Sequence, residues 1–241
     1  MEISLAIKRP FSDVKNLLIG IGIATLSSVG IFLALFLLDT SFLLALVVGG
    51  VMLFIPFFIT LGYYLENAKR AAKKDYKSVE WSGFGKFLKT GFTASVIGFV
   101  YSIPLLLVMI FTIGLPLAEL ALSGQEPDIT TLIGLGTNLV FGVLITFILA
   151  IFLAYLLPAA SISYAMTGKF KSAFDFKTIK KRAFNADYFV AWIIGVGYTI
   201  VISLVFALVF FFLPPLGAGL GAFISSVTMY SLLGRAWGSA K

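Results

Sequence analysis

Cysteine and histidine are absent from this 241-residue chain, and charged residues are few. Without cysteine no disulfide can form. Without histidine the chain lacks the commonest general base and the commonest metal ligand. Charged residues make up 12% of the sequence, against roughly a quarter in ordinary soluble domains. Because 60% of the residues are hydrophobic, a soluble fold of this length is excluded. Because histidine and cysteine are absent, neither a cofactor nor a metal site is expected.

The hydrophobic residues form long stretches that contain no charged residue. A helix needs about 20 apolar residues to cross a bilayer core of about 30 Å, and each stretch reaches that length. Their continuous apolar character differs from the alternating pattern of β-barrel strands. The sequence therefore predicts an all-α protein that crosses a membrane several times. The stretches are residues 16–38, 40–65, 90–118, 129–168 and 188–234.

Two of these stretches are too long for one simple crossing. Residues 188–234 would form a helix of about 70 Å, and Pro214-Pro215 interrupts them, because proline lacks an amide donor and fixes its φ angle. In residues 129–168 no turn breaks the first half, so one span with a kink at Pro158 is favoured over two. The prediction is a polytopic bundle forming a single six-helix transmembrane domain, residues 1–241. Its expected spans are residues 17–38, 42–65, 91–117, 131–158, 188–213 and 216–234.

The distribution of charge predicts the orientation of the six spans. All 18 Lys and Arg residues lie in four segments on the same side of the predicted membrane, and the loops on the other side carry acidic residues alone. The positive-inside rule then places both termini and the two long basic loops in the cytoplasm, as parts of a multi-pass cell-membrane protein. The basic segments are 1–16, 66–90, 168–187 and 235–241, and the opposite acidic residues are Asp39, Glu119, Glu126 and Asp128.

The basic loops, residues 66–90 and 168–187, also carry aromatic residues at helical spacing, with lysines beside them. Short helices of this kind lie in the headgroup plane, so we expect anionic lipids of the cytoplasmic leaflet as partners and do not expect nucleic acid. The plainer alternative is that these charges set the topology alone. The candidate headgroup contacts are Lys69, Arg70, Lys73, Lys74, Lys86, Lys89, Lys177, Lys180, Lys181 and Arg182. The candidate interfacial aromatics are Trp81, Phe84, Phe87, Phe92, Phe176, Phe184, Tyr188 and Trp192.

A threefold internal repeat is predicted from the placing of the basic segments. Each of the first three precedes an odd-numbered span, and the N-terminal IKRPF is similar to the later IKKRAF. The repeated unit would be an interfacial helix followed by a transmembrane hairpin. The units would start near residues 4, 82 and 174.

Several short motifs carry a resemblance to a known family. In the second basic loop, AFDF at residues 173–176 precedes a basic helix, and ADYFVAW at residues 186–192 follows that helix. The third span contains YSIP at residues 101–104. An EW-x-x-FG-x-F-x-x-x-G pattern occupies residues 80–91. With these motifs the chain resembles the prokaryotic, largely archaeal, integral membrane proteins catalogued as domain of unknown function 4013. The resemblance implies the fold and the membrane location and brings no known activity.

Few residues offer chemistry inside the predicted spans. No ionisable side chain lies at mid-membrane, where such groups tend to be functional. Asn138 is open to two interpretations, a substrate contact or, as we favour, an interhelical hydrogen bond. The acidic outer loop with Glu119, Glu126 and Asp128 is either a divalent-cation site or, as we favour, a solvated loop, since it lacks ordered ligand spacing.

The sixth predicted span carries small residues at four-residue spacing, Gly217, Gly221 and Ser225. Small residues let helices approach closely, so this span is expected to pack against neighbours, in the same chain or in a second copy. As function we expect a non-enzymatic bundle that binds lipids or membrane partners through a basic cytoplasmic face. The alternative is a permease for a small solute or lipid, with a cavity between hairpin units. A polar-lined cavity would favour the permease.

Overall fold

The computed structural model describes residues 3–124 and 129–240, and all regular secondary structure in these residues is helical. Six helices in this described part are long and apolar enough to cross a membrane. The prediction of an all-α polytopic fold is therefore confirmed. Asp13 begins the first span by accepting a hydrogen bond from the Asn16 amide, and the break before the last span falls at the proline pair 214–215. The segments that could span run over Val14–Leu37, Phe42–Ala72, Phe84–Leu122, Gly136–Thr167, Ala186–Val209 and Pro214–Ser239.

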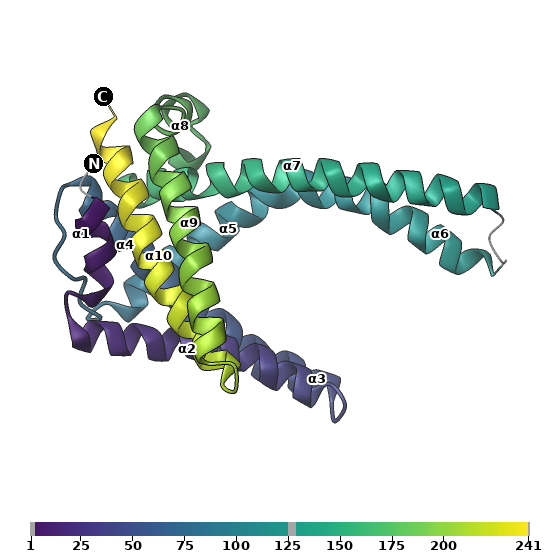
Figure 1. Ribbon diagram of the computed structural model, residues 1–241, viewed down its shortest axis with the longest axis horizontal. Helices are drawn as coiled ribbons and strands as arrows, with labels where there is room; N and C mark the ends of the chain where they lie inside the picture. Colours follow the sequence, from purple (N-terminus) through teal and green to yellow (C-terminus); the bar gives the residue numbers. More distant parts are fainter. Residues whose placement is uncertain (1–2, 125–128, 241) are drawn as a thin grey trace. The chain divides into compact units, whose positions relative to one another are not determined.

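Figure 1 shows helices α1 to α10, coloured along the sequence from the N-terminus to the C-terminus. Two of the spans contain a turn of π-helix, so each is built from several elements that continue one another. The elements are α1 (Ile3–Lys8), η1 (Arg9–Phe11), α2 (Val14–Leu37), α3 (Phe42–Leu44), η2 (Ala45–Gly49), α4 (Gly50–Ala72), α5 (Phe84–Met109), η3 (Ile110–Gly114), α6 (Leu115–Ser123), α7 (Ile129–Thr167), η4 (Phe170–Phe174), α8 (Phe176–Ala183), α9 (Ala186–Val209) and α10 (Pro214–Ser239).

The chain forms two compact units. Unit 1 comprises residues 1–96 and 158–241, and unit 2 comprises residues 97–157. Unit 2 is a helical hairpin: α7 runs beside α5 and η3, so that Gly142 lies against the Thr112 side chain and Gly98 faces Leu157. Asn138 is exposed on α7 in this unit.

In unit 1 the central helix is α10, which packs against α2, α4 and α9. Its most apolar stretch is 61% buried, compared with 17% for α2. Glycines of α10 make two of these contacts possible, because a Cβ at Gly219 would overlap Thr25 of α2 and one at Gly234 would overlap the Ala68 backbone of α4. Close backbone approach of this kind drives helix association in membranes, where there is no hydrophobic force between helices.

The first turns of α5 also lie in unit 1, where they cross α4 at two glycines. A Cβ at Gly62 would overlap the Phe87 backbone, and one at Gly91 would overlap the carbonyl oxygen of Phe58. The predicted interfacial helix at residues 82–92 is thus not separate from the third span, because the helix that begins at Phe84 continues to Met109. In the other basic segment α8 is a short helix of its own, which ends before α9 begins. The threefold repeat stays a prediction.

Candidate functional site: the basic end of unit 1

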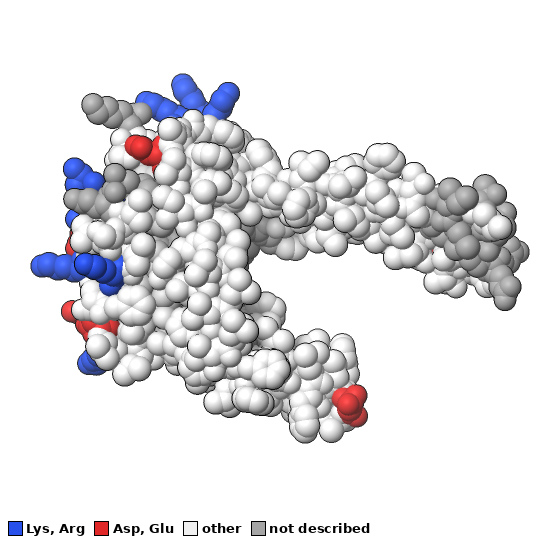
Figure 2. Space-filling model, viewed as in Figure 1, with Lys and Arg blue, Asp and Glu red and all other residues white. Residues whose placement is uncertain are grey.

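The Lys and Arg residues of unit 1 gather along the edge that carries both chain termini and α8 (Figure 2). Hydrogen bonds join the segments at this edge, as described below. The name basic end is used below for six neighbouring parts of unit 1: the N-terminal segment 3–13, the last turns of α4, the loop 73–83, the first turns of α5, the segment 169–185 and the last turns of α10. At this end seven predicted headgroup contacts have exposed side chains, Lys73, Lys74, Lys86, Lys89, Lys177, Lys180 and Lys181.

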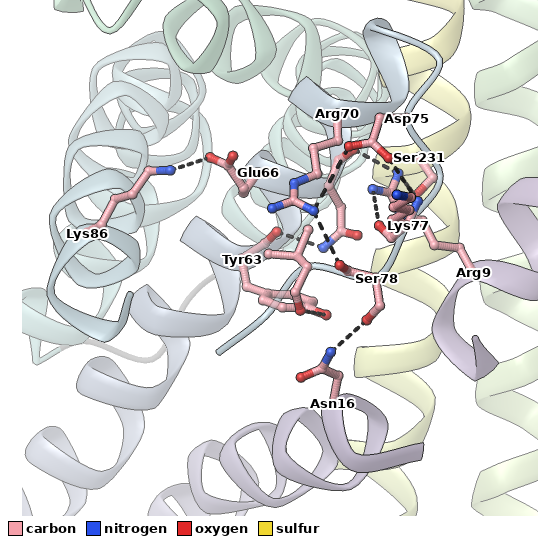
Figure 3. A network of polar contacts seen from close by, with 12 residues as sticks. Arg9, Asn16, Tyr63, Glu66, Arg70, Asp75, Lys77, Ser78, Lys86 and Ser231 are labelled. Atoms are coloured by element: carbon pink, nitrogen blue, oxygen red, sulfur yellow. Dashed lines mark hydrogen bonds and ion pairs between the residues drawn. The ribbon is translucent and has the colours of Figure 1, made fainter. Parts of the chain in front are cut away.

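The loop 73–83 is fixed by a buried arginine that the sequence did not single out. Arg9 lies in η1 with 3% of its surface exposed. Its Nη1 donates to the carbonyl oxygen of Asn67 at 3.0 Å, and its Nη2 donates to that of Lys77 at 3.2 Å (Figure 3). Its Nη1 also lies 3.5 Å from the Ser231 hydroxyl of α10. Burial lowers the pKa of Arg9 to about 10, and the nearby Asp75 carboxylate opposes that change, so Arg9 remains charged at neutral pH.

A second group of contacts holds the same loop to the start of α2. Asn16 donates from Nδ2 to the Ser78 hydroxyl at 2.8 Å, and its carbonyl oxygen accepts from Trp81 Nε1 at 2.9 Å. Trp81 stacks on Tyr63 of α4, with ring centroids 4.0 Å apart and planes 3° apart. The Tyr63 hydroxyl donates to the Val79 carbonyl at 3.1 Å. The loop is therefore a packed cap over the ends of α2 and α4.

This packing corrects part of the predicted set of interfacial aromatics. Trp81, Phe87 and Tyr188 are buried inside the protein, so their rings are not available to lipid. An aromatic side chain at the edge of a bundle can bury its apolar ring against protein or against lipid, and the sequence pattern is the same in both cases. Trp192 is half-buried. The exposed members of the set are Phe84, Phe92, Phe176 and Phe184.

Three of the predicted cations are half-buried, and two of these are engaged by the protein itself. Lys69 is half-buried on α4. Arg70 donates from Nη1 to the Ser78 carbonyl at 3.3 Å and lies 4.0 Å from Asp75. Arg182 donates to the Trp237 carbonyl at 2.9 Å, with its guanidinium carbon 5.6 Å from the centre of that ring. The exposed Lys86 pairs with Glu66 at 2.9 Å.

The lysines of the second basic segment that were predicted to contact headgroups lie on α8. Asp175 begins this helix, accepting from the Thr178 hydroxyl at 2.7 Å and from its amide at 3.2 Å. The bond from the Thr178 hydroxyl, with smaller help from the amide, holds the pKa of Asp175 below its usual value. Ile179 and Ala183 are buried, while Lys177, Lys180 and Lys181 are exposed. The apolar face of α8 therefore packs on protein, and its lysines face outward.

The predicted packing residues of α10 are all buried, but they differ in what they touch. A Cβ at Gly217 would come within 2.7 Å of the Phe206 carbonyl of α9, whereas one at Gly221 would find its nearest neighbour at 3.6 Å. All three, Gly217, Gly221 and Ser225, line a pocket of about 630 Å³ between α9 and α10. Other lining groups are the hydroxyls of Thr199 and Ser203 on α9.

The predicted acidic outer loop is only partly described, because Glu126 and Asp128 lie outside the described residues. Among the residues that the structure does describe, His, Cys, Asp and Glu form no group of three or more that could hold a metal ion.

The apolar spans and the charged end together define a polytopic helical membrane protein. A family model matches residues 44–212, well over half of the chain, and the chain therefore belongs to the family described as protein of unknown function DUF4013. The resemblance carried by its short motifs is confirmed by this match. No curated protein and no solved structure matches the chain.

Proposed function

We propose that this protein is a non-enzymatic membrane protein whose basic end faces the cytoplasm and binds the anionic headgroups of the surrounding lipids. The observation that carries the proposal is the gathering of exposed lysines at the end of unit 1 where helices leave the apolar region (Figure 2). Each lysine near an anionic leaflet contributes about 1 kcal/mol of attraction. Nucleic acid is the less favoured partner, because the exposed aromatics lie on helices and not on a sheet face where bases stack.

The positions of the exposed aromatics support a membrane surface as the partner. Phe84 and Phe92 lie on the first turns of α5, where a span begins, and Phe176 begins α8. Lysines stand beside them in both segments. An apolar ring next to a cation suits the boundary between headgroups and acyl chains, where both kinds of group find a partner.

The experiment is lipid retention measured by native mass spectrometry on protein released from nanodiscs. The nanodiscs contain equal phosphatidylglycerol and phosphatidylcholine, and the wild type is expected to retain mainly phosphatidylglycerol. Replacing Lys177, Lys180 and Lys181 together by Gln should lower that preference by about tenfold or more, since each charge contributes about 1 kcal/mol. Replacement of the same three residues by Arg is the matched control and should preserve it. Equal retention of the two lipids by the wild type would contradict the proposal.

A second candidate function, permeation of a lipid or small solute, is favoured by the pocket between α9 and α10. Its volume of about 630 Å³ lies within the range of ligand sites. Its lining is mainly apolar with a few hydroxyl groups, and it lies between the two helices of one hairpin, not between hairpin units as predicted. If the pocket passes lipids, the reconstituted protein should accelerate transbilayer movement of fluorescent lipids in a dithionite quenching assay. Gly221→Phe should block that movement by filling the pocket. Lipid movement no faster than in protein-free vesicles would contradict lipid permeation as the function.

A further inference from the structure

A second, smaller pocket opens at the basic end and has a charged lining. Its volume is about 140 Å³. Glu66 and Arg70 contribute to it from the last turns of α4, Glu80 from the loop, and Lys86 from the first turn of α5. Figure 3 shows Lys86 and Glu66 pointing toward one another, with Arg70 beyond Glu66. All of these residues belong to unit 1.

The lining carries two positive and two negative side chains. Lys86 and Glu66 pair at 2.9 Å, and Arg70 uses Nη1 for Ser78 and, more distantly, for Asp75. Glu80 is exposed and makes no hydrogen bond or ion pair with another described residue. A ligand with negative charge alone would be repelled by the two carboxylates of the lining, and a ligand with positive charge alone would be repelled by the two bases. A ligand that carries both charges can meet the bases through its anionic group and the carboxylates through its cationic group.

The size of the pocket limits the ligand to a small polar group. At about 30 Å³ for each water-sized group, a pocket of about 140 Å³ holds roughly five such groups. That is enough for a phosphate, with its substituent extending toward the exposed Glu80 side chain, and too little for an acyl chain. Because the pocket lies between the end of one span and the start of the next, a lipid could place its headgroup here and keep its chains in the bilayer. The exposed ring of Phe84 lies at the start of that next span.

We propose that this pocket binds a phosphoethanolamine group, with the phosphate held by Arg70 and Lys86 and the ammonium held by Glu80 and Glu66. The ammonium has three N–H donors, and a carboxylate accepts such bonds well. A choline group has the same charge and no N–H donor, so it fits the site less well. The site deepens the proposed function and rests on it in one respect, that the basic end faces a membrane surface. The group could come from phosphatidylethanolamine or from free phosphoethanolamine.

The test uses nanodiscs of equal phosphatidylethanolamine, phosphatidylcholine and phosphatidylglycerol, with retained lipids identified by native mass spectrometry. The wild type should retain phosphatidylethanolamine over phosphatidylcholine, and Glu80→Gln should lower this preference on the order of tenfold, since a charge-assisted hydrogen bond is lost. Glu80→Asp, which keeps the charge, should restore most of it. Because Glu80 is exposed, the variants should melt like the wild type.

Two further measurements distinguish the possible outcomes of this test. The Gln variant of Lys177, Lys180 and Lys181 should lose phosphatidylglycerol and keep the ethanolamine preference, so the failure of the general basic-end proposal is seen independently of this site. Free phosphoethanolamine added to phosphatidylcholine nanodiscs tests the soluble source. Binding of it that is lost in Glu80→Gln, without enrichment of the lipid, would support the site and assign it to a soluble ligand. The site is overturned if the wild type prefers neither ligand, or if Glu80→Gln changes nothing.

Discussion

Arg9 joins segments that are far apart in the sequence, and its removal should release the loop 73–83. Hydrogen bonds to a charged donor are worth about 1.5–3 kcal/mol each, and Arg9 makes two to backbone carbonyls, those of Asn67 and Lys77. Only the Lys77 carbonyl belongs to the loop, so in Arg9→Gln we expect the loop to open about ten to a hundred times more often, because that carbonyl loses its donor. Limited trypsin digestion in detergent would measure this, as faster cleavage after Lys73 and Lys77.

Lys8→Gln is the matched control for this prediction. It removes the same charge from the neighbouring position, where the side chain is exposed, so cleavage should stay at the wild-type rate. Equal rates in the Arg9 and Lys8 variants, both faster than the wild type, would show that net charge and not the buried contacts controls the loop. Equal rates at the wild-type value would show that other contacts, such as those of Asn16 and Trp81, suffice to hold it.

At the scale of elements, the packing of α10 on α9 should be sensitive to substitution of Gly217 and should tolerate substitution of Gly221. The added methyl of Gly217→Ala would meet the Phe206 carbonyl of α9 and the side chain of Phe210, which follows that helix. Overpacking costs about 1–3 kcal/mol, and for a chain of this size each kcal/mol lowers the melting temperature by about 2–4 °C. The variant should therefore melt about 2–12 °C lower, followed by circular dichroism in detergent.

Gly221→Ala, one helical turn further along α10, provides the comparison. Its methyl group would find its nearest neighbour at 3.6 Å, an ordinary contact at the edge of the pocket. Alanine is also favoured over glycine in a helix by about 1 kcal/mol, so the melting temperature should stay level or rise. A larger fall for Gly221→Ala than for Gly217→Ala would contradict the packing described for α10.

The positions of the spans could largely be predicted from the sequence, but the residues that each helix buries against its neighbours could not. Stretches without charge identify spans because a buried charge is costly in lipid, and the proline pair at residues 214–215 identifies the last break. The predicted interfacial position of Phe87 is wrong because its ring is buried, and a ring at this spacing is equally suited to lipid and to packing against Tyr63 and Trp81. Arg9 was missed because its partners are backbone carbonyls, which carry no sequence signal.

For the whole molecule, the one-sided placement of charge leads to a prediction about orientation. The described cations of unit 1 lie at the basic end, while Asp39 lies beyond the other end of α2. If the positive-inside rule holds, the turn between α2 and α3 faces the exterior and the loop 73–83 faces the cytoplasm. Because the natural chain contains no cysteine, single cysteines can report on each position without background labelling.

Thr40→Cys and Ser82→Cys are the informative variants, since both side chains are exposed. A membrane-impermeant maleimide added to intact cells should label the cysteine at position 40, because the turn lies outside. The cysteine at position 82 should be labelled after the membrane is permeabilised and not before, which also shows that the site is reactive. Labelling of position 82 in intact cells, with position 40 protected, would invert the topology. It would place the lysines of the basic end against the outer leaflet, and the proposed cytoplasmic headgroup contacts would then be wrong.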